Sequence, residues 1–376
     1  MKINIVTLHR ARNYGSVLQT LATQMFFEEF GCETEIIDYY PERYTSRGLL
    51  NRLKNKSDRL RSNPFLLILA KIAISFSYLK KHIIFNNFLK MYINLTYKTF
   101  RNEKELKKYC FDADAYCTGS DQVWNSHWNE GVDKPLFLDF LPENAFRFSF
   151  ASSIGNSELK RDEEEIIAPL LSKYQHISVR EDSAVCIVKK LGFLEVEHLL
   201  DPTLLYDKRQ WEVYTSKKIR KRKYVVTYNL HHDKKIDIYA SEIARKQKLE
   251  LLNISYNWHD VLRRGKLIWC PNVEEYLSLL RDAEYVVTDS FHATAFSLIF
   301  ETKFIDIFPQ KASSRLKSLL YLTNTMNRGF EGMPPIEAAD ATINFKQIHH
   351  ILKMEREKSV NYIKRVLQDI VLLMEE

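Results

Sequence analysis

The feature that most constrains the fold is an apolar strand pattern that ends in a polar turn and continues at once as a helix pattern. The clearest example is the β-branched run at 285–288, followed by Asp289 and Ser290 and by an apolar helical face over 291–300. In open α/β sheets, ligands bind beyond the carboxyl ends of the strands, where helix N-termini offer free N–H groups. His292 would stand at such a rim. The alternative is that Asp289 or Ser290 only caps the helix and that His292 is a surface residue.

The same pattern recurs in two successive halves of the chain. Before a polar, charged linker at 206–222, strand patterns lie at 2–9, 34–39, 115–118, 146–152 and 177–179. After it they lie at 224–229, 251–255, 266–270, 285–288 and 302–308. This alternation predicts an α/β protein of two Rossmann-like domains facing across a cleft.

The expected domain boundaries follow from that rhythm and from a chain length of 376 residues, which favours two domains. Residues 1–206 would form the first domain, with a helical basic insertion at about 41–108. Residues 207–345 would form the second domain. Helices at 346–376 could pack back on the first.

The insertion carries most of the positive charge. Residues 43–108 hold 16 Lys and Arg against three acidic residues, so this segment is +13 while the chain as a whole is +7. Its apolar run at 65–78 is shorter than the roughly 20 residues that span a bilayer, and Lys71 interrupts it. The segment is either a helical insertion packed on the first domain or a basic amphipathic surface lying on anionic lipid, and both can hold together.

Several classes of function receive no support. The sequence has no G-x-G and no G-K-[ST], and it shows no nucleic-acid-binding motif and no metal-ligand cluster. The five cysteines form no C-x-x-C pair, and the N-terminus turns polar too quickly for a signal peptide. We therefore expect a cytoplasmic protein without metal or nucleic acid.

Other polar residues also follow strand patterns. The turn Asn13-Tyr14-Gly15 follows the first strand, Ser120 and Asp121 follow 115–118, and Arg180 follows 177–179. Each has a structural alternative. The turn residues could serve only to shape the chain, Asp121 could bond its own backbone, and Arg180 could form a structural ion pair with Glu181 or Asp201. If the two domains face each other, Arg180 and His292 could meet in the cleft.

With these residues in view, the chain resembles the polysaccharide pyruvyl transferase family. The matching stretches occur in the family's order and are Asn13-Tyr14-Gly15, Gly119-Ser120-Asp121, Ser178-Val179-Arg180-Glu181, Asp201-Pro202-Thr203-Leu204 and Asp289-Ser290-Phe291-His292-Ala293. The resemblance implies a glycosyltransferase-B-like architecture. It also implies transfer of the carboxyvinyl unit of phosphoenolpyruvate onto a sugar, giving a pyruvate ketal and phosphate.

The resemblance suggests roles for the site residues. Arg180 would bind the donor, His292 would protonate its methylene carbon, and Asp121 would act as the base. Characterised members tend to carry Arg-Leu-His where this chain has Ser290-Phe291-His292, so Arg315 is our candidate replacement cation and Lys311 a weaker one. Ser290 is assigned to the donor side. The residues assigned to the acceptor side of the cleft are Asn13, Tyr14, Gly15, Ser120 and Asp289.

The expected reaction therefore uses phosphoenolpyruvate as co-substrate and no other cofactor. Its acceptor would be a lipid-linked oligosaccharide or polysaccharide, met at the inner face of the plasma membrane through residues 43–108. One alternative is a nucleotide-sugar-dependent glycosyltransferase of the same architecture. A second is an inactive sugar-binding homologue.

Overall fold

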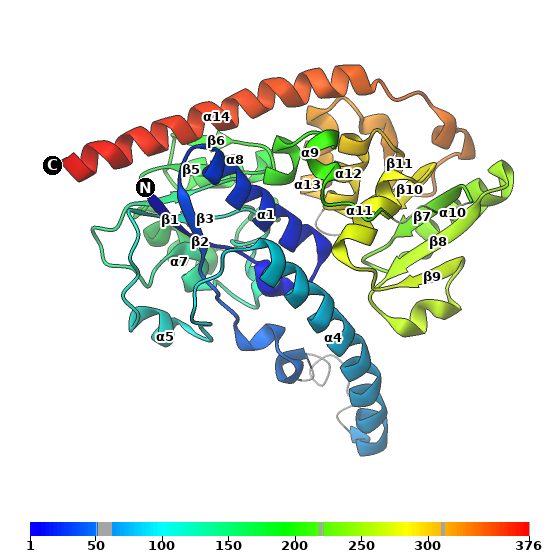
Figure 1. Cartoon of the computed structure of the whole chain (residues 1–376), viewed down its shortest axis with the longest axis horizontal. Coiled ribbons are helices and arrows are strands. Elements are labelled where there is room, and N and C mark those ends of the chain that lie inside the picture. The colour runs from blue at the N-terminus through cyan, green and yellow to red at the C-terminus, as the bar shows by residue number, and fades with distance from the viewer. Residues whose placement is uncertain (50, 52–61, 218–219, 221, 310–312, 376) are drawn as a thin grey trace.

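The computed structural model describes residues 1–49, 51, 62–217, 220, 222–309 and 313–375, which form two α/β domains, each built on parallel strands (Figure 1). Lys311, a candidate cation, lies outside the described residues, and so do residues 50 and 52–61 of the basic segment 43–108. The expected pair of Rossmann-like domains is confirmed.

The first sheet has the strand order β2-β1-β3-β4, and all its pairs are parallel. Its strands are β1 (Lys2–Val6), β2 (Glu33–Ile36), β3 (Ala115–Thr118) and β4 (Arg147–Ser149). A parallel pair, β5 (Ile177–Val179) and β6 (Val196–His198), extends the sheet through single bridges from Phe148 to His176 and from Ser152 to Val179. The sequence did not predict β6.

The second sheet is parallel throughout, in the order β12-β11-β10-β7-β8-β9. Its strands are β7 (Tyr224–Tyr228), β8 (Glu250–Ser255), β9 (Lys266–Trp269), β10 (Tyr285–Thr288), β11 (Lys303–Ile307) and β12 (Gly329–Phe330). Every residue of β7 and β10 is buried, as expected for central strands with helices on both faces.

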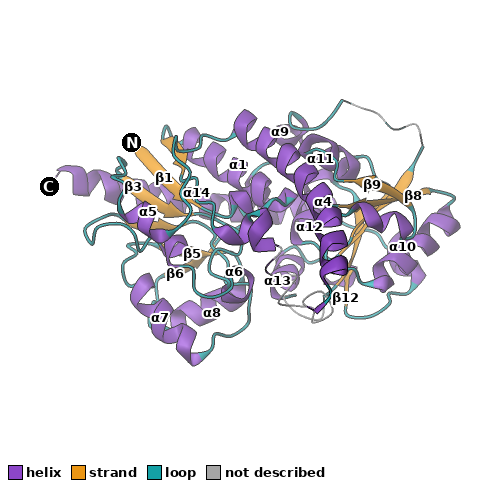
Figure 2. Cartoon of the chain, turned by 90° about the horizontal axis from the view of Figure 1, so that it is seen from below, coloured by secondary structure: helices purple, strands orange, loops and turns teal. Residues whose placement is uncertain are grey.

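Helices connect and cover the strands (Figure 2). They are α1 (Tyr14–Glu29), α4 (Pro64–Tyr92), α5 (Glu103–Lys107), α6 (Ser126–Asn129), α7 (Arg161–Leu171), α8 (Asp182–Lys190), α9 (Lys208–Glu212), α10 (Lys234–Gln247), α11 (Val273–Arg281), α12 (Phe291–Phe300), α13 (Ser314–Leu322) and α14 (Phe345–Glu375). In contrast to the amphipathic helices at the surface, α12 is buried along its whole length and α1 along nearly all of it.

Helix α1 lies where the two domains meet. The Tyr14 ring stacks on Tyr276 of α11, with ring centroids 4.0 Å apart and planes 6° apart. Its hydroxyl donates to the Pro271 carbonyl oxygen at 2.7 Å. The N-terminus of α1 therefore belongs to the first domain by sequence but packs directly on the second.

The insertion after β2 is dominated by α4, a single helix whose N-terminal half projects away from the rest of the molecule (Figure 1). Its C-terminal half packs on the body through the buried Phe85, Phe88 and Leu89. No described helix combines the length and apolar character needed to cross a membrane.

Helix α14 runs from the second domain along the first (Figure 1). Tyr362 donates to the Ser149 carbonyl oxygen at the end of β4 at 2.7 Å, and His176 Nε2 lies 2.8 Å from Asp369. Arg356 donates to the carbonyl oxygens of Leu204 and Tyr206 at 2.8 and 3.0 Å. This long helix thus ties the end of the chain to the first sheet.

Candidate active site

The strand ends of the two domains meet at one buried carboxylate, that of Asp201. Arg180, directly after β5, donates through Nη1 to Asp201 Oδ2. Nε2 of His292, in the first turn of α12, lies 3.6 Å from the same oxygen. The side chains of Arg180 and Asp201 are 1% and 0% exposed. A guanidinium from the first domain and an imidazole from the second therefore share one anion.

Asp201 is held rigidly in the first domain. Its Oδ1 accepts hydrogen bonds from the N–H and hydroxyl of Thr203 at 3.0 and 2.6 Å, and its Oδ2 accepts from Ser120 at 3.1 Å. Burial opposes ionisation, but the charges of Arg180 and His292 outweigh it and hold the pKa of Asp201 well below its usual range. Asp201 is therefore a carboxylate that lies between the guanidinium of Arg180 and the imidazole of His292.

Asp121 forms the adjacent wall of the same site. Ser16, in the first turn of α1, donates to its Oδ2 at 2.6 Å, and Arg180 Nη2 lies 3.6 Å from its Oδ1. Burial is outweighed by the charges of Arg180 and His292, which lower the pKa of Asp121. Its backbone has φ of +74°, a left-handed conformation that costs a non-glycine residue energy. Asp121 also accepts a hydrogen bond from the N–H of Gln122, as in the turn interpretation.

His292 contacts the N-terminus of α1. Its ring lies so close to Gly15 that a Cβ at that position would sit 2.0 Å from Nδ1. Its Nε2 is buried and, among the described residues, has no hydrogen-bond partner. The side chain of Asn13 caps α1 by accepting from the N–H of Ser16 at 2.7 Å. The first turn of α1 thus supplies part of the pocket around His292.

Asp289 and Ser290 lie beside His292 but are bonded elsewhere. Asp289 accepts from the N–H groups of Leu230 and His231 at 2.7 and 3.0 Å and from His231 Nδ1 at 2.7 Å. This hydrogen bond raises the pKa of His231. Ser290 is the N-cap of α12, and its hydroxyl accepts from the N–H of Ala293 at 3.4 Å. Both side chains therefore organise the turn between β10 and α12.

A hollow between the two domains lies next to this cluster. It is lined by Asp182, Ser183, Ser314, Lys317, Ser318, Tyr321 and Met326. The first two residues are on α8, directly after Arg180 and Glu181, and the next four are on α13, which also carries Arg315. The sequence did not point to this hollow, because the pairing of α8 with α13 is a tertiary contact.

Several donor groups near the hollow have no hydrogen-bond partner in the described part of the chain. These are the hydroxyls of Ser183 and Ser314, Nε of Arg315, and Nε and Nη2 of Arg180. Burial and the charge of Arg180 lower the pKa of Arg315 to about 10, so this guanidinium stays protonated near neutral pH. Unsatisfied buried donors around two cations are what an anionic ligand with several oxygen atoms would complete.

A family profile described as polysaccharide pyruvyl transferase matches residues 13–308, which include Asn13, Asp121, Arg180, Asp201 and His292. The chain belongs to the polysaccharide pyruvyl transferase family. The resemblance inferred from the ordered motifs is thereby confirmed. A comparison with curated proteins gave no match.

Solved structures share the fold of this pyruvyl transferase family member at low sequence identity. A putative UDP-N-acetylglucosamine 2-epimerase from Listeria monocytogenes aligns with a TM-score of 0.55 and 7% identity, covering 96% of this chain and 91% of that chain. UDP-GlcNAc 2-epimerase from Neisseria meningitidis bound to UDP-GlcNAc aligns with a TM-score of 0.52 and 10% identity, covering 98% and 100%. These similarities confirm the glycosyltransferase-B-like architecture.

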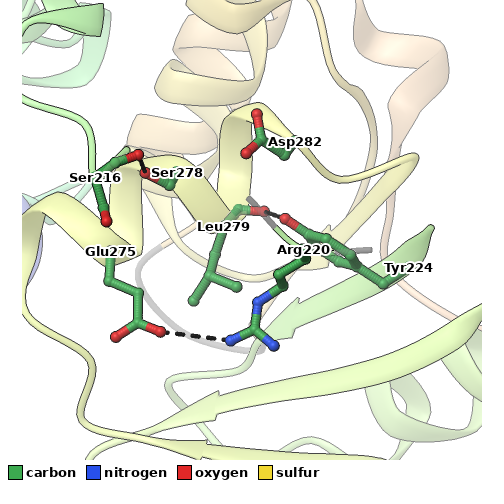
Figure 3. Close-up of a pocket in the computed structure, with 7 residues that line it drawn as sticks. All are labelled: Ser216, Arg220, Tyr224, Glu275, Ser278, Leu279 and Asp282. Atoms are coloured by element: carbon green, nitrogen blue, oxygen red, sulfur yellow. Dashed lines mark hydrogen bonds and ion pairs between the residues drawn. The ribbon is translucent and has the colours of Figure 1, made fainter. Parts of the chain in front are cut away.

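The pocket shown in Figure 3 is separate from the site of the pyruvyl transferase family member. It lies between α11 and the start of β7, where Arg220 pairs with Glu275 at 3.4 Å and Tyr224 donates to the Leu279 carbonyl oxygen at 3.1 Å (Figure 3). It contains none of the predicted site residues.

Within the described ranges, no group of three His, Cys, Asp or Glu side chains is placed to hold a metal ion.

Proposed function

We propose that this protein transfers the pyruvyl unit of phosphoenolpyruvate to two hydroxyls of a sugar on a lipid-linked oligosaccharide, forming a cyclic ketal. The observation that carries the proposal is the meeting of Arg180 and His292 at Asp201, beside donor groups without partners. Phosphoenolpyruvate bears a phosphate and a carboxylate, and Arg180 and Arg315 with the start of α13 match that pair of anions.

The chemistry begins with protonation of the donor. His292, beside Asp201, gives a proton to the methylene carbon, and positive charge develops on the neighbouring enol carbon. A sugar hydroxyl attacks that carbon and loses its proton to a base, the role assigned to Asp121. The carbon–oxygen bond to phosphate then breaks. The second hydroxyl adds to the same carbon and gives its proton to the departed phosphate, so the products are one ketal carrying a methyl and a carboxylate group, and one hydrogen phosphate.

Asp121 also has a second role in this scheme. A carboxylate whose pKa is lowered is a weak base, but it stabilises the positive charge that develops on the enol carbon. The first turn of α1 and Ser120 would line the acceptor side, where Gly15 allows close approach to His292. Asp289 and Ser290 would act through the turn that places His292.

The test is an assay with phosphoenolpyruvate and glycolipid extracted from the source membrane. Phosphate release together with the ketal mass on the glycolipid supports the proposal. His292→Ala should abolish both signals, whereas His127→Ala, at an exposed position of α6, should leave them unchanged. Full activity of His292→Ala would remove the proposed acid.

A second candidate is a glycosyltransferase that uses a nucleotide sugar. It is favoured by one observation, the fold shared with an epimerase bound to UDP-GlcNAc. Calorimetry with UDP-GlcNAc and with phosphoenolpyruvate separates the two donors. Acceptor binding with no turnover of either donor would identify an inactive sugar-binding homologue.

Contact with the membrane is part of the proposal. The projecting half of α4 exposes large apolar side chains, among them Phe65, Leu66 and Ile68, within the +13 segment at 43–108. Apolar residues within a basic segment suit the surface of an anionic bilayer at the inner face of the plasma membrane. Flotation with phosphatidylglycerol vesicles at low salt tests it. Flotation that Phe65→Ser together with Ile68→Ser leaves unchanged would exclude α4 as the contact.

A further inference from the structure

A second group of cations lies at the N-terminus of α1, around Arg12. Arg12 is 5% exposed and has a left-handed backbone, with φ of +53°. Its guanidinium carbon lies 4.2 Å from the ring centroid of Tyr78 and 5.4 Å from that of Tyr40. Its Nη2 lies 2.9 Å from His82 Nδ1. We call Arg12, Lys81 and Arg101, with these three partners, the Arg12 cluster.

Lys81 and Arg101 complete the positive charge of the Arg12 cluster. Lys81 Nζ lies 4.2 Å from the ring centroid of Tyr256, whose hydroxyl accepts from the N–H of Tyr14 at 3.2 Å. Arg101, at the exposed edge, has its guanidinium carbon 4.4 Å from the Tyr40 ring centroid. The cluster therefore reaches from α4 across the start of α1 to the second domain.

The carboxylate of Asp38, which pairs with Arg10, forms no ion pair with these cations among the described residues. Asp38 accepts two hydrogen bonds from Arg10, each at 2.6 Å, and further ones from His9 and Thr99 at 3.0 and 2.5 Å. Among the described residues, Arg12, Lys81 and Arg101 form no ion pair with a carboxylate, and Nε of Arg12 is buried without a hydrogen-bond partner. The guanidinium of Arg12 is held by the Tyr40 hydroxyl, by His82 and by the two tyrosine rings, and with no carboxylate beside it this buried cation can bind an anionic ligand.

The position of the Arg12 cluster relates it to the site around His292. Arg12 is three residues before Gly15, which contacts His292, and three extended residues span at most about 10 Å. On its other side the cluster includes Tyr78, Lys81 and His82 of α4, the helix whose outer half exposes Phe65 and Ile68. The cluster thus lies between the proposed reaction site and the proposed membrane contact.

We propose that the Arg12 cluster binds the phosphate or pyrophosphate group that joins the acceptor sugar to its lipid carrier. This inference rests on the proposed function, because it assigns the acceptor. Arginine and lysine side chains beside hydroxyl donors are the groups that hold phosphate oxygens. Tyr40 and Tyr78 carry the hydroxyls here: that of Tyr40 accepts a hydrogen bond from Arg12 Nη2, and the hydroxyl oxygens of the two tyrosines are 3.1 Å apart.

Titration calorimetry with inorganic pyrophosphate tests the site on the full chain without phosphoenolpyruvate. Arg12→Gln and Lys81→Gln should each weaken binding at least tenfold, and Arg101→Gln about threefold. Arg161→Gln, a matched charge change at an exposed position of α7, should have no effect. Arg315→Gln should also retain binding, because Arg315 lies at the donor site and forms no ion pair with a carboxylate among the described residues.

Each of the following results would overturn the proposal. One is unchanged binding in Lys81→Gln and Arg101→Gln, which keep Arg12 and so report on the site even if Arg12→Gln unfolds. Another is loss of binding in Arg315→Gln, which would assign pyrophosphate to the donor site. Vesicles of phosphatidylglycerol distinguish the sources of phosphate. Vesicle binding that depends on Arg12, without pyrophosphate binding, would assign the cluster to lipid headgroups and contradict the acceptor assignment.

The readout also separates this inference from the proposed function. Pyrophosphate binding is measured without any donor, so failure of pyruvyl transfer does not affect it. If transfer to a lipid-linked acceptor occurs while pyrophosphate binding ignores Arg12 and Lys81, the Arg12 cluster is wrong and the proposed function stands.

Discussion

Gly15 packs against the imidazole of His292 with no space for a side chain, because a Cβ at residue 15 would lie 2.0 Å from Nδ1. The contact joins the first turn of α1 to the first turn of α12. The pocket around the proposed acid therefore depends on a backbone position in the other domain.

Gly15→Ala should displace the imidazole and lower turnover at least tenfold, because a misplaced catalytic group loses reactive geometry. Steady-state phosphate release from phosphoenolpyruvate with glycolipid acceptor measures the effect. Gly332→Ala is the matched control, since nothing lies within 4 Å of its added Cβ. Normal turnover in Gly15→Ala would show that the contact with His292 has no catalytic consequence.

Asp201→Asn should destabilise the fold, because buried Arg180 would lose the carboxylate that it bonds directly and keep only that of Asp121, 3.6 Å away. Breaking a buried ion pair on one side costs about 3–5 kcal/mol. Urea denaturation followed by far-UV circular dichroism measures the change. Glu165→Gln, which removes the partner of exposed Arg161, should change stability by less than about 0.5 kcal/mol. Equal stability of Asp201→Asn and wild type would contradict the structural role of Asp201.

Leu352→Ala tests how strongly α14 holds to the body of the protein. Leu352 is fully buried, and removing such a side chain costs about 2–5 kcal/mol. Leu372→Ala on the same helix is the control, because Leu372 is 53% exposed and should cost little. Similar losses in the two variants, measured by urea denaturation, would mean that α14 is not packed as described.

Pyrophosphate binding should weaken as pH rises through about 8. Burial lowers the pKa of Lys81 to about 8, with Cys270 opposing the shift and Arg12 adding to it. Above that pH the lysine loses its charge, and the attraction for an anion falls with it. Because pyrophosphate itself changes its protonation in this pH range, the pH profile of binding in the wild type is compared with that in Lys81→Met. A pH profile between 7 and 9.5 that is identical in wild type and Lys81→Met would exclude Lys81 from the site.

Much of the fold was predictable because its strands are short, apolar and followed by polar turns. The runs ending at Thr118, Val179 and Thr288 all became buried parallel strands. β6 was missed because its three residues, Val196–His198, include Glu197 and His198 and give no apolar run. The extent of α4 was also not predicted, because an exposed apolar face mimics a core pattern in sequence.

The candidate site was predictable only in part. The positions of Arg180 and His292 followed from strand ends, because parallel strands place such residues at one edge. The ion pair of Arg180 with Asp201 was one of the alternatives that the sequence offered, whereas the approach of His292 to Asp201 depends on how the two domains pack, which no local pattern encodes. The same holds for Ser183, Ser314 and Arg12, because their lack of hydrogen-bond partners can be seen only once the segments that pack around them are in place.

The residues at the start of α1 contact α4, the second domain and both proposed catalytic residues. Within five consecutive positions, Arg12 meets α4, Tyr14 stacks on the second domain, Gly15 contacts His292 and Ser16 holds Asp121. If the two domains move apart, His292 moves with the second domain, while Arg12 and Ser16 stay with the first. An acceptor bound through its phosphate could then enter first. His292, the proposed acid, would reach the donor only when the two domains close. The closed site would keep water away from the enol phosphate.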